Sequence, residues 1–271
     1  MARLASTRDA DASVPPSASR RDRARWYVLV VPMLENGPVR LHYETVGDGP
    51  PILLLAPGGL RASRVATWAS APWNPIEALA DRYTVVAMDQ RNTGTSFAPI
   101  TAIDGWPSYA ADQLAVMDHL GIERFAVLGM CIGGAFIMEL LDEVPERVTA
   151  AVALQPIGLD DNRDAFRTMF DEWRTNIVDG HPEASDADWE GCWTNLFGGD
   201  DVLWSVPDEK PAEIDTPILV LQGNDLYHPR SASLLLAQAA PRATLIERWK
   251  DPADQPAARA AVDDFLAAHA A

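Results

Sequence analysis

The sequence is poor in cysteine, in positive charge and in long apolar runs. Its two cysteines, Cys131 and Cys192, are too few for a disulfide framework, which fits a reducing compartment. Acidic side chains outnumber basic ones by 39 to 22, and the formal net charge of -17 repels nucleic acid backbones and anionic lipid headgroups. No apolar run approaches the ~20 residues of a membrane-spanning helix. We therefore expect neither nucleic acid nor a membrane as a partner.

Patterns that bind metals or cofactors are also lacking. The cysteines and histidines do not follow ligand spacings such as C-x-x-C or H-x-x-x-H. The sequence has neither the G-x-G-x-x-G pattern of dinucleotide-binding folds nor the Gly-Lys-Ser/Thr ending of a phosphate-binding loop. We expect a protein that uses no metal and no organic cofactor.

Residues 1–25 differ in composition from the rest of the chain. They hold six arginines, three aspartates and almost no large apolar residue, so they cannot bury enough surface to offset the entropy of ordering. A secretory signal would need an apolar stretch of ~7–15 residues, which this segment does not contain. We expect a disordered tail, with a docking arm as the alternative, and a cytoplasmic protein.

From Trp26 onward, short β-branched runs alternate with amphipathic stretches, which is typical of a mostly parallel sheet with helical crossovers. Residues 27–33 and 39–46 are expected to form a hairpin with its turn at 35–38. Further strands are expected at 52–56, 84–89, 125–129, 149–155, 217–222 and 243–247. Helices are expected at 74–81, 109–120, 133–142, 232–240 and 256–268.

Residues 160–211 interrupt this alternation. The segment is rich in tryptophan, phenylalanine and aspartate, has helical patterns at 166–177 and 186–196, and shows no convincing strand. We expect a helical cap inserted into a core formed by residues 26–159 and 212–271.

The aromatic side chains of this segment are candidates for the wall of an apolar pocket. Trp173 and Trp193 are two of them, although aromatic residues at helical spacing more often only pack. The expected partner is a small-molecule substrate, partly apolar, because the acidic surface disfavours a polyanion. The sequence leaves the oligomeric state open.

The most informative string runs from Phe125 to Ala135, where a buried strand passes through Gly-x-Cys-x-Gly into a helix. Glycines at positions 129 and 133 permit a sharp turn that holds Cys131 in a strained conformation. At a helix amino terminus, the partial positive charge lowers the pKa of a thiol and favours the reactive thiolate. The string resembles the nucleophile elbow of the α/β-hydrolase superfamily, with Cys131 where the family usually has serine.

Four further segments follow in the order of that family, so the resemblance covers about residues 26–271. The run Pro57-Gly58-Gly59 is similar to the His-Gly-Gly oxyanion loop, with proline in place of histidine. The resemblance implies an α/β-hydrolase fold in which the N–H groups of Gly59 and Ile132 bind an oxyanion. A plain glycine turn is the alternative.

Two of the four segments are expected to serve structure. Residues 88–96 look like the Asp-x-Arg-x-x-Gly-x-Ser turn of the family, in which an aspartate and an arginine can satisfy loop backbone groups and one another. Residues 109–124 are similar to the helix and Leu-Gly turn that lead into the elbow strand. They fix the register of the comparison.

The fourth segment, residues 220–229, is similar to the acid loop of the family and puts Asp225 at the acid position, where a carboxylate orients an imidazole. A solvated loop aspartate is the alternative. The family carries its base histidine seven residues before a helix-opening proline. Counted back from Pro256, that position is Trp249, so the expected base is missing.

His228 is the best replacement for this base, because it lies three residues beyond Asp225 on the same loop and could reach Cys131 directly. A surface or structural histidine is the alternative. The other histidines are expected to have no part in the chemistry: His42, His119, His181 and His269.

Lys250 and Glu247 lie near the vacated position and are weaker candidates for a base, since a buried lysine can lose its proton near neutral pH. Trp249 is expected to fill the space or to wall a ligand pocket. Cys192, beside Trp193, is expected to be a small buried apolar residue.

Two classes of function fit the pattern. In the first, Cys131 attacks an activated carbonyl of an ester, lactone or thioester and forms an acyl-cysteine, as cysteine variants of the dienelactone-hydrolase type imply by analogy. In the second, the chain is a cofactor-free lyase, cyclase or acyltransferase, or a ligand-binding relative without turnover. Deacylation by water is demanding without a base, which weakens plain hydrolysis.

Overall fold

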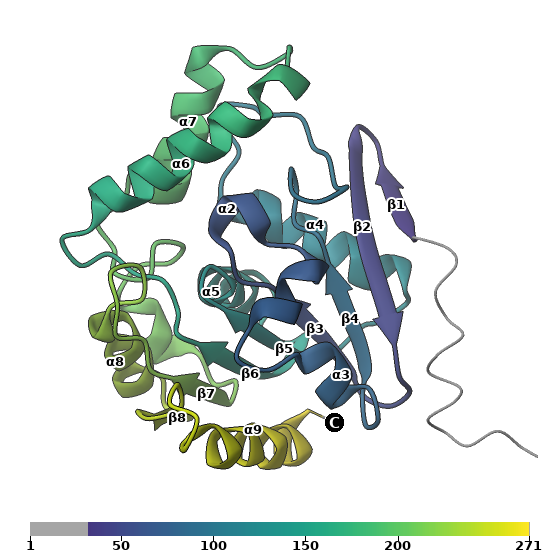
Figure 1. Cartoon of the computed structure of the whole chain (residues 1–271), viewed down its shortest axis with the longest axis vertical. Coiled ribbons are helices and arrows are strands. Elements are labelled where there is room, and N and C mark those ends of the chain that lie inside the picture. Colours follow the sequence, from purple (N-terminus) through teal and green to yellow (C-terminus); the bar gives the residue numbers. More distant parts are fainter. Residues whose placement is uncertain (1–31, 271) are drawn as a thin grey trace, which may run out of the picture. The chain divides into compact units, whose positions relative to one another are not determined.

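The computed structural model describes residues 32–270. The expected tail at 1–25 and residues 27–31 of the first expected strand lie outside the described residues. An eight-stranded sheet has the strand order β1-β2-β4-β3-β5-β6-β7-β8, and helices cover both of its faces (Figure 1). Within residues 32–270, no helix is long and apolar enough to cross a membrane.

The first three strands of the sheet pair antiparallel, β1 with β2 and β2 with β4, and all later pairs are parallel. The strands are β1 (Met33–Asn36), β2 (Val39–Val46), β3 (Pro51–Leu55), β4 (Thr84–Met88), β5 (Phe125–Met130), β6 (Val148–Leu154), β7 (Ile218–Leu221) and β8 (Ala243–Ile246).

The helices follow the strands as the sequence predicts, with their ends shifted by up to three residues. They are α2 (Gly59–Ala62), α3 (Pro75–Leu79), α4 (Trp106–His119), α5 (Gly133–Glu143), α6 (Arg163–Ile177), α7 (Asp186–Phe197), α8 (Arg230–Ala239) and α9 (Gln255–His269). The 3-10 helices are η2 (Val65–Ser70), η3 (Val178–Gly180) and η4 (Lys210–Glu213).

The first hairpin is confirmed, but its turn is shorter than expected. Asn36 pairs with Val39, so two residues assigned to the turn by sequence, Glu35 and Asn36, belong to β1. Gly37 has a φ of 60°, a left-handed conformation that glycine adopts without a steric penalty, and this permits the two-residue turn.

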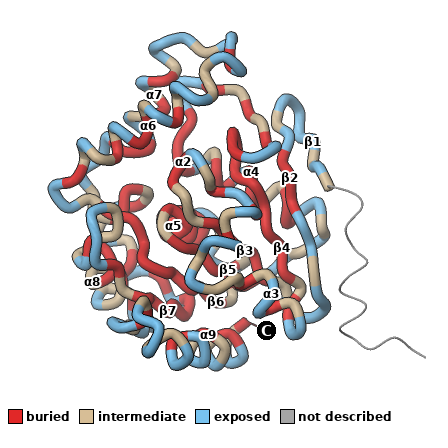
Figure 2. Tube along the Cα trace, viewed as in Figure 1, coloured by how far each residue is buried: buried red, intermediate tan, exposed pale blue. Residues whose placement is uncertain are grey.

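Successive side chains of β3 alternate between two apolar clusters. Leu53 and Leu55 belong to the cluster that also holds side chains of α4, α5 and α8. Ile52 and Leu54 belong to the cluster that holds side chains of α3 and α9. The central strands are buried on both faces, as the red strands in Figure 2 show, and therefore occur in the sequence as continuous apolar runs.

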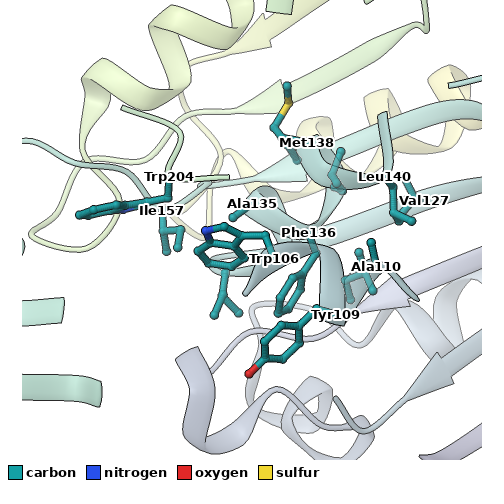
Figure 3. Close-up of a cluster of buried hydrophobic side chains, with 14 of the residues drawn as sticks. Trp106, Tyr109, Ala110, Val127, Ala135, Phe136, Met138, Leu140, Ile157 and Trp204 are labelled. Atoms are coloured by element: carbon teal, nitrogen blue, oxygen red, sulfur yellow. The ribbon is translucent and has the colours of Figure 1, made fainter. Parts of the chain in front are cut away.

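Aromatic packing fixes the helix that follows the elbow. Trp106 and Tyr109 of α4 place their rings against Phe136 of α5, with centroids 5.8 Å and 4.9 Å apart (Figure 3). Such pairs contribute about 0.5–1.5 kcal/mol each beyond the area they bury. Because α5 begins two residues after Cys131, this packing also fixes the position of that residue.

Residues 160–211 form α6 and α7 and contain no strand. The two helices contact each other, and α6 also contacts the short helix α2 (Figure 1). That this segment acts as a cap over a ligand site stays a prediction.

The turn after β4 supports the structure, as predicted. Asp89 accepts hydrogen bonds from the N–H groups of Val65 and Thr95 at 2.8 and 3.1 Å. Arg91 does not pair with Asp89; its guanidinium instead bonds Asp112 at 2.8 and 3.0 Å, and Asp104 at 2.6 Å. None of these groups lines the cavity that contains Cys131.

Candidate active site

Cys131 lies at the sharp turn between β5 and α5. Its φ of 62° is the left-handed conformation that non-glycine residues rarely adopt. The turn leaves no room for side chains around it: a Cβ on Gly129 would lie 2.7 Å from the carbonyl oxygen of Gly133, and one on Gly133 would lie 2.6 Å from that of Leu55. The glycines of the elbow are therefore required by close backbone packing.

His228 and Asp225 lie on the loop between β7 and α8. Nδ1 of His228 is 2.6 Å from Oδ1 of Asp225. The backbone holds both residues, because each N–H donates to the carbonyl oxygen of the other at 3.1–3.2 Å. The imidazole is mostly buried, with 12% of its side chain exposed, while Asp225 is half-exposed. One tight turn thus aligns the carboxylate with the ring.

The other edge of the imidazole faces the cavity that Cys131 also lines. Within residues 32–270, the buried Nε2 atom of His228 has no hydrogen-bond partner. Burial raises the pKa of the Cys131 thiol, but the neighbouring His228 and the N–H groups of Gly58 and Ile132 outweigh burial and lower it. Burial lowers the pKa of His228, but Cys131 and Asp225 together raise it above its usual value.

These opposite shifts favour a proton on the imidazole and a negative charge on the sulfur. Burial raises the pKa of Asp225, but His228 and Lys250 outweigh burial and lower it, so the carboxylate stays charged. Lys250 donates to Oδ2 of Asp225 at 3.2 Å and to Oδ1 of Asn224 at 2.6 Å. Asp225 therefore lies between two positively charged groups.

Cys131 opens into a cavity of about 200 Å³, in which it is partly exposed. The wall is mostly apolar. It is formed by Gly58, Gly59, Arg61, Cys131, Ile132, Ile157, Phe166, Met169, Tyr227 and His228. An apolar wall with a few polar groups is the usual composition of a small-molecule site.

The structure places the other predicted pocket residues elsewhere. Trp249 is buried in the cluster on the α9 side of the sheet, and its Nε1 donates to the carbonyl oxygen of Gln222 at 2.9 Å. Trp173 is buried against Phe170, and Trp193 also packs on Phe170. None of these three tryptophans lines the cavity beside Cys131.

Several residues of the cavity could not be identified from the sequence. Met169 comes from α6 and Tyr227 from the loop of His228, so their meeting depends on the fold. Phe166 of α6 belongs to the aromatic candidates of residues 160–211, and it does line the cavity. Gly58, rather than Gly59, is the glycine whose N–H lowers the pKa of Cys131. Gly59 lines the cavity, and its part in an oxyanion site stays a prediction.

The remaining thiol and imidazoles lie away from the cavity. Burial raises the pKa of Cys192 to about 12, so this thiol is inert. His181 is stacked on Phe97 and bonded to Glu183 at 2.9 Å, and His42 lies 3.1 Å from Asp89. Among residues 32–270, no three His, Cys, Asp or Glu side chains gather in a way that could hold a metal ion.

Three comparisons with known proteins agree on the kind of fold. A family model described as the alpha/beta hydrolase fold matches residues 51–192. A relative from Azorhizobium caulinodans, named "Putative carbamate hydrolase RutD", is 39% identical over 155 residues, which cover 57% of this chain and 54% of the relative. The soluble epoxide hydrolase of Corynebacterium sp. strain C12 is 29% identical over 154 residues, 51% of each chain.

This chain thus spans about half the length of these two relatives. Among solved structures, the enol-lactonase from Burkholderia xenovorans LB400 has a TM-score of 0.65 and 21% identity, over 87% of this chain and 100% of that chain. At this level of identity, the likeness concerns the fold alone.

Proposed function

Since the chain belongs to the α/β hydrolase fold family, we propose that it is a hydrolase of activated carbonyl compounds, with Cys131 as nucleophile, His228 as base and Asp225 as the acid that orients the base. The substrate is an ester, lactone or thioester. The observation that carries the proposal is that Cys131 and His228 line one cavity, while Asp225 lies behind the imidazole with its Oδ1 2.6 Å from Nδ1 of His228.

Acylation begins from the thiolate of Cys131. The sulfur attacks the carbonyl carbon, and the electron pair of the C=O bond moves onto the oxygen, which the N–H group of Ile132 and a glycine N–H of residues 58–59 stabilise. When the oxyanion collapses, the bond to the leaving group breaks. The leaving group takes the proton of the His228 imidazolium, and an acyl-cysteine remains.

Deacylation uses the same imidazole, which is now neutral. His228 removes a proton from water, the hydroxide oxygen attacks the thioester carbon, and the sulfur leaves as thiolate. Asp225 stabilises the imidazolium in both halves of the reaction, and Lys250 holds Asp225. Because His228 supplies the base, water can resolve the thioester and hydrolysis is favoured over the other reaction types.

Two further expectations complete the proposal. Residues 160–211 form the cap, because Phe166 and Met169 of α6 supply part of the cavity wall beside Cys131. The carbamate in the name of the Azorhizobium relative is itself a carbonyl compound, which supports carbonyl substrates for this chain.

The test is a panel of nitrophenyl esters and acyl thioesters. We expect turnover by the full chain and an acyl adduct in its intact mass after rapid quenching, both of which Cys131→Ala abolishes. Cys192→Ala is the matched control, because its thiol is buried, and we expect it to keep both signals. Turnover that survives in Cys131→Ala would overturn the proposed nucleophile.

A further inference from the structure

The cavity wall carries basic side chains, although the chain as a whole is acidic. The whole chain carries a formal net charge of -17. Yet the cavity wall includes two groups that can carry positive charge, Arg61 and His228, and no carboxylate. His228 is occupied by Cys131 and Asp225 in the proposed chemistry. Arg61 has no part in that chemistry, so its place on the wall needs another reason.

Arg61 lines the cavity from the short helix α2, which begins within the glycine pair Gly58-Gly59. Its Nη1 donates to Oε2 of Glu172 on α6 at 2.5 Å. Both side chains are half-exposed, at 50% and 53%. Water screens such an ion pair, so it is weak and its partner can be exchanged. The guanidinium has five N–H donors, which leaves others for a ligand.

The remainder of the wall defines what such a ligand looks like. Ile157, Phe166 and Met169 form an apolar surface in the same cavity as Arg61 and Cys131. The volume of about 200 Å³ suits a small molecule rather than a polymer. A guanidinium matches the planar geometry of a carboxylate, which can accept two parallel hydrogen bonds.

We propose that Arg61 forms a carboxylate-binding subsite, so that the substrate is a short carbonyl compound with its reactive carbon at Cys131 and a carboxylate at Arg61. This inference rests on the proposed function of the same cavity. In the free protein, the carboxylate of Glu172 pairs with Arg61, and the substrate carboxylate would replace it. The competing role for Arg61 is only to tie α2 to α6 through Glu172.

Two variants separate these roles. Arg61→Met removes both the subsite and the tie. Glu172→Gln breaks the ion pair but frees the guanidinium for the substrate. If Arg61 binds a carboxylate, the two variants change the preference for anionic substrates in opposite directions. If Arg61 only ties the helices, they change it in the same direction. Arg64→Met is the control, because Arg64 is exposed on the same segment and does not line the cavity.

The first measurement compares mono(4-nitrophenyl) adipate with 4-nitrophenyl hexanoate, which have acyl chains of equal length and differ in a terminal carboxylate. We expect a higher kcat/KM for the adipate in the unmodified protein. That ratio should fall about fivefold in Arg61→Met, rise in Glu172→Gln and stay unchanged in Arg64→Met. A ratio that Arg61→Met leaves unchanged would refute the subsite.

The second measurement does not depend on turnover. Cys131 is alkylated with iodoacetate, which is anionic, and with iodoacetamide, which is neutral, and the two rates are compared. We expect the iodoacetate to iodoacetamide ratio to fall several-fold in Arg61→Met and not in Arg64→Met. If neither ester is hydrolysed while this ratio still falls, the proposed reaction fails and the subsite stands. If the ratio does not fall, the subsite fails whatever the esters show.

Discussion

The single residue on which the chemistry depends most is His228. It accounts for much of the lowering of the Cys131 pKa, against burial, which acts in the opposite direction. It is held on its other edge by Asp225 at 2.6 Å. The usual base position of the family holds Trp249, which is buried on another face of the sheet. Base and acid therefore share one loop, and the geometry of the site is set over four consecutive residues.

Replacing His228 by asparagine should raise the pKa of Cys131, because burial would then act without its main opponent. In the unmodified protein, we expect the rate of alkylation by iodoacetamide to have its midpoint below the ~8.5 of a free thiol. In His228→Asn the midpoint should move above that value, and ester turnover should fall by about two orders of magnitude or more.

The matched control for this change is His269→Asn in α9, remote from the cavity. It should leave both the alkylation profile and the turnover unchanged. An alkylation midpoint that is the same with and without His228 would show that the imidazole does not act on the sulfur.

At the scale of elements, the α/β-hydrolase fold predicted from the sequence is confirmed, because its elements are specified locally. The apolar runs of β3 and β5 and the helical pattern of α5 occur within short windows. The series of Cys131, His228 and Asp225 could be anticipated for the same reason: the elbow and the loop are short motifs. Most of the cavity wall could not, because residues such as Arg61 and Met169 come together across more than a hundred residues of sequence. Trp173 and Trp193 are aromatic, as pocket residues often are. Their rings nevertheless pack on Phe170, because the sequence does not show which face of a helix points to a cavity.

The loop that carries His228 depends on the segment before α6. Nδ2 of the buried Asn162 donates to the carbonyl oxygen of Leu226 at 2.6 Å and to that of Gly158 at 3.0 Å. The N–H of Gly158 donates to the carbonyl oxygen of Tyr227 at 3.4 Å. These bonds join the segment before α6 to two successive carbonyl groups of the loop, immediately before His228, and so help to hold the imidazole in place.

Asn162→Ala should therefore loosen His228 and raise the alkylation midpoint of Cys131, with a loss of about 1–3 kcal/mol in the free energy of unfolding. Alkylation profiles and urea unfolding measure the two effects. Asn195→Ala is the control, because Nδ2 of Asn195 likewise donates to two carbonyl oxygens, at 3.0 and 3.1 Å, away from the cavity. If both variants lower stability and neither moves the midpoint, Asn162 is only structural.

For the molecule as a whole, we expect one buried carboxyl group, that of Glu139, to make stability depend on pH. Glu139 lies on α5 and is buried, with 5% of its surface exposed. Burial, Glu143 and Asp142 all raise its pKa, to about 7. The folded state therefore holds this proton more tightly than the unfolded chain does. The contribution to stability is full below about pH 4.5 and is lost as pH rises through about 7.

Glu139→Gln keeps the shape of the side chain and removes the titration. Relative to the unmodified protein, the variant should gain about 2 kcal/mol in the free energy of unfolding between pH 5 and pH 8, since one pKa unit corresponds to about 1.4 kcal/mol and partial solvent screening reduces the total. Urea unfolding at several pH values measures this gain. The exposed Glu146 provides the control, because Glu146→Gln changes the net charge equally without burial. An equal pH dependence in both variants would mean that the overall charge, and not the burial of Glu139, sets the profile.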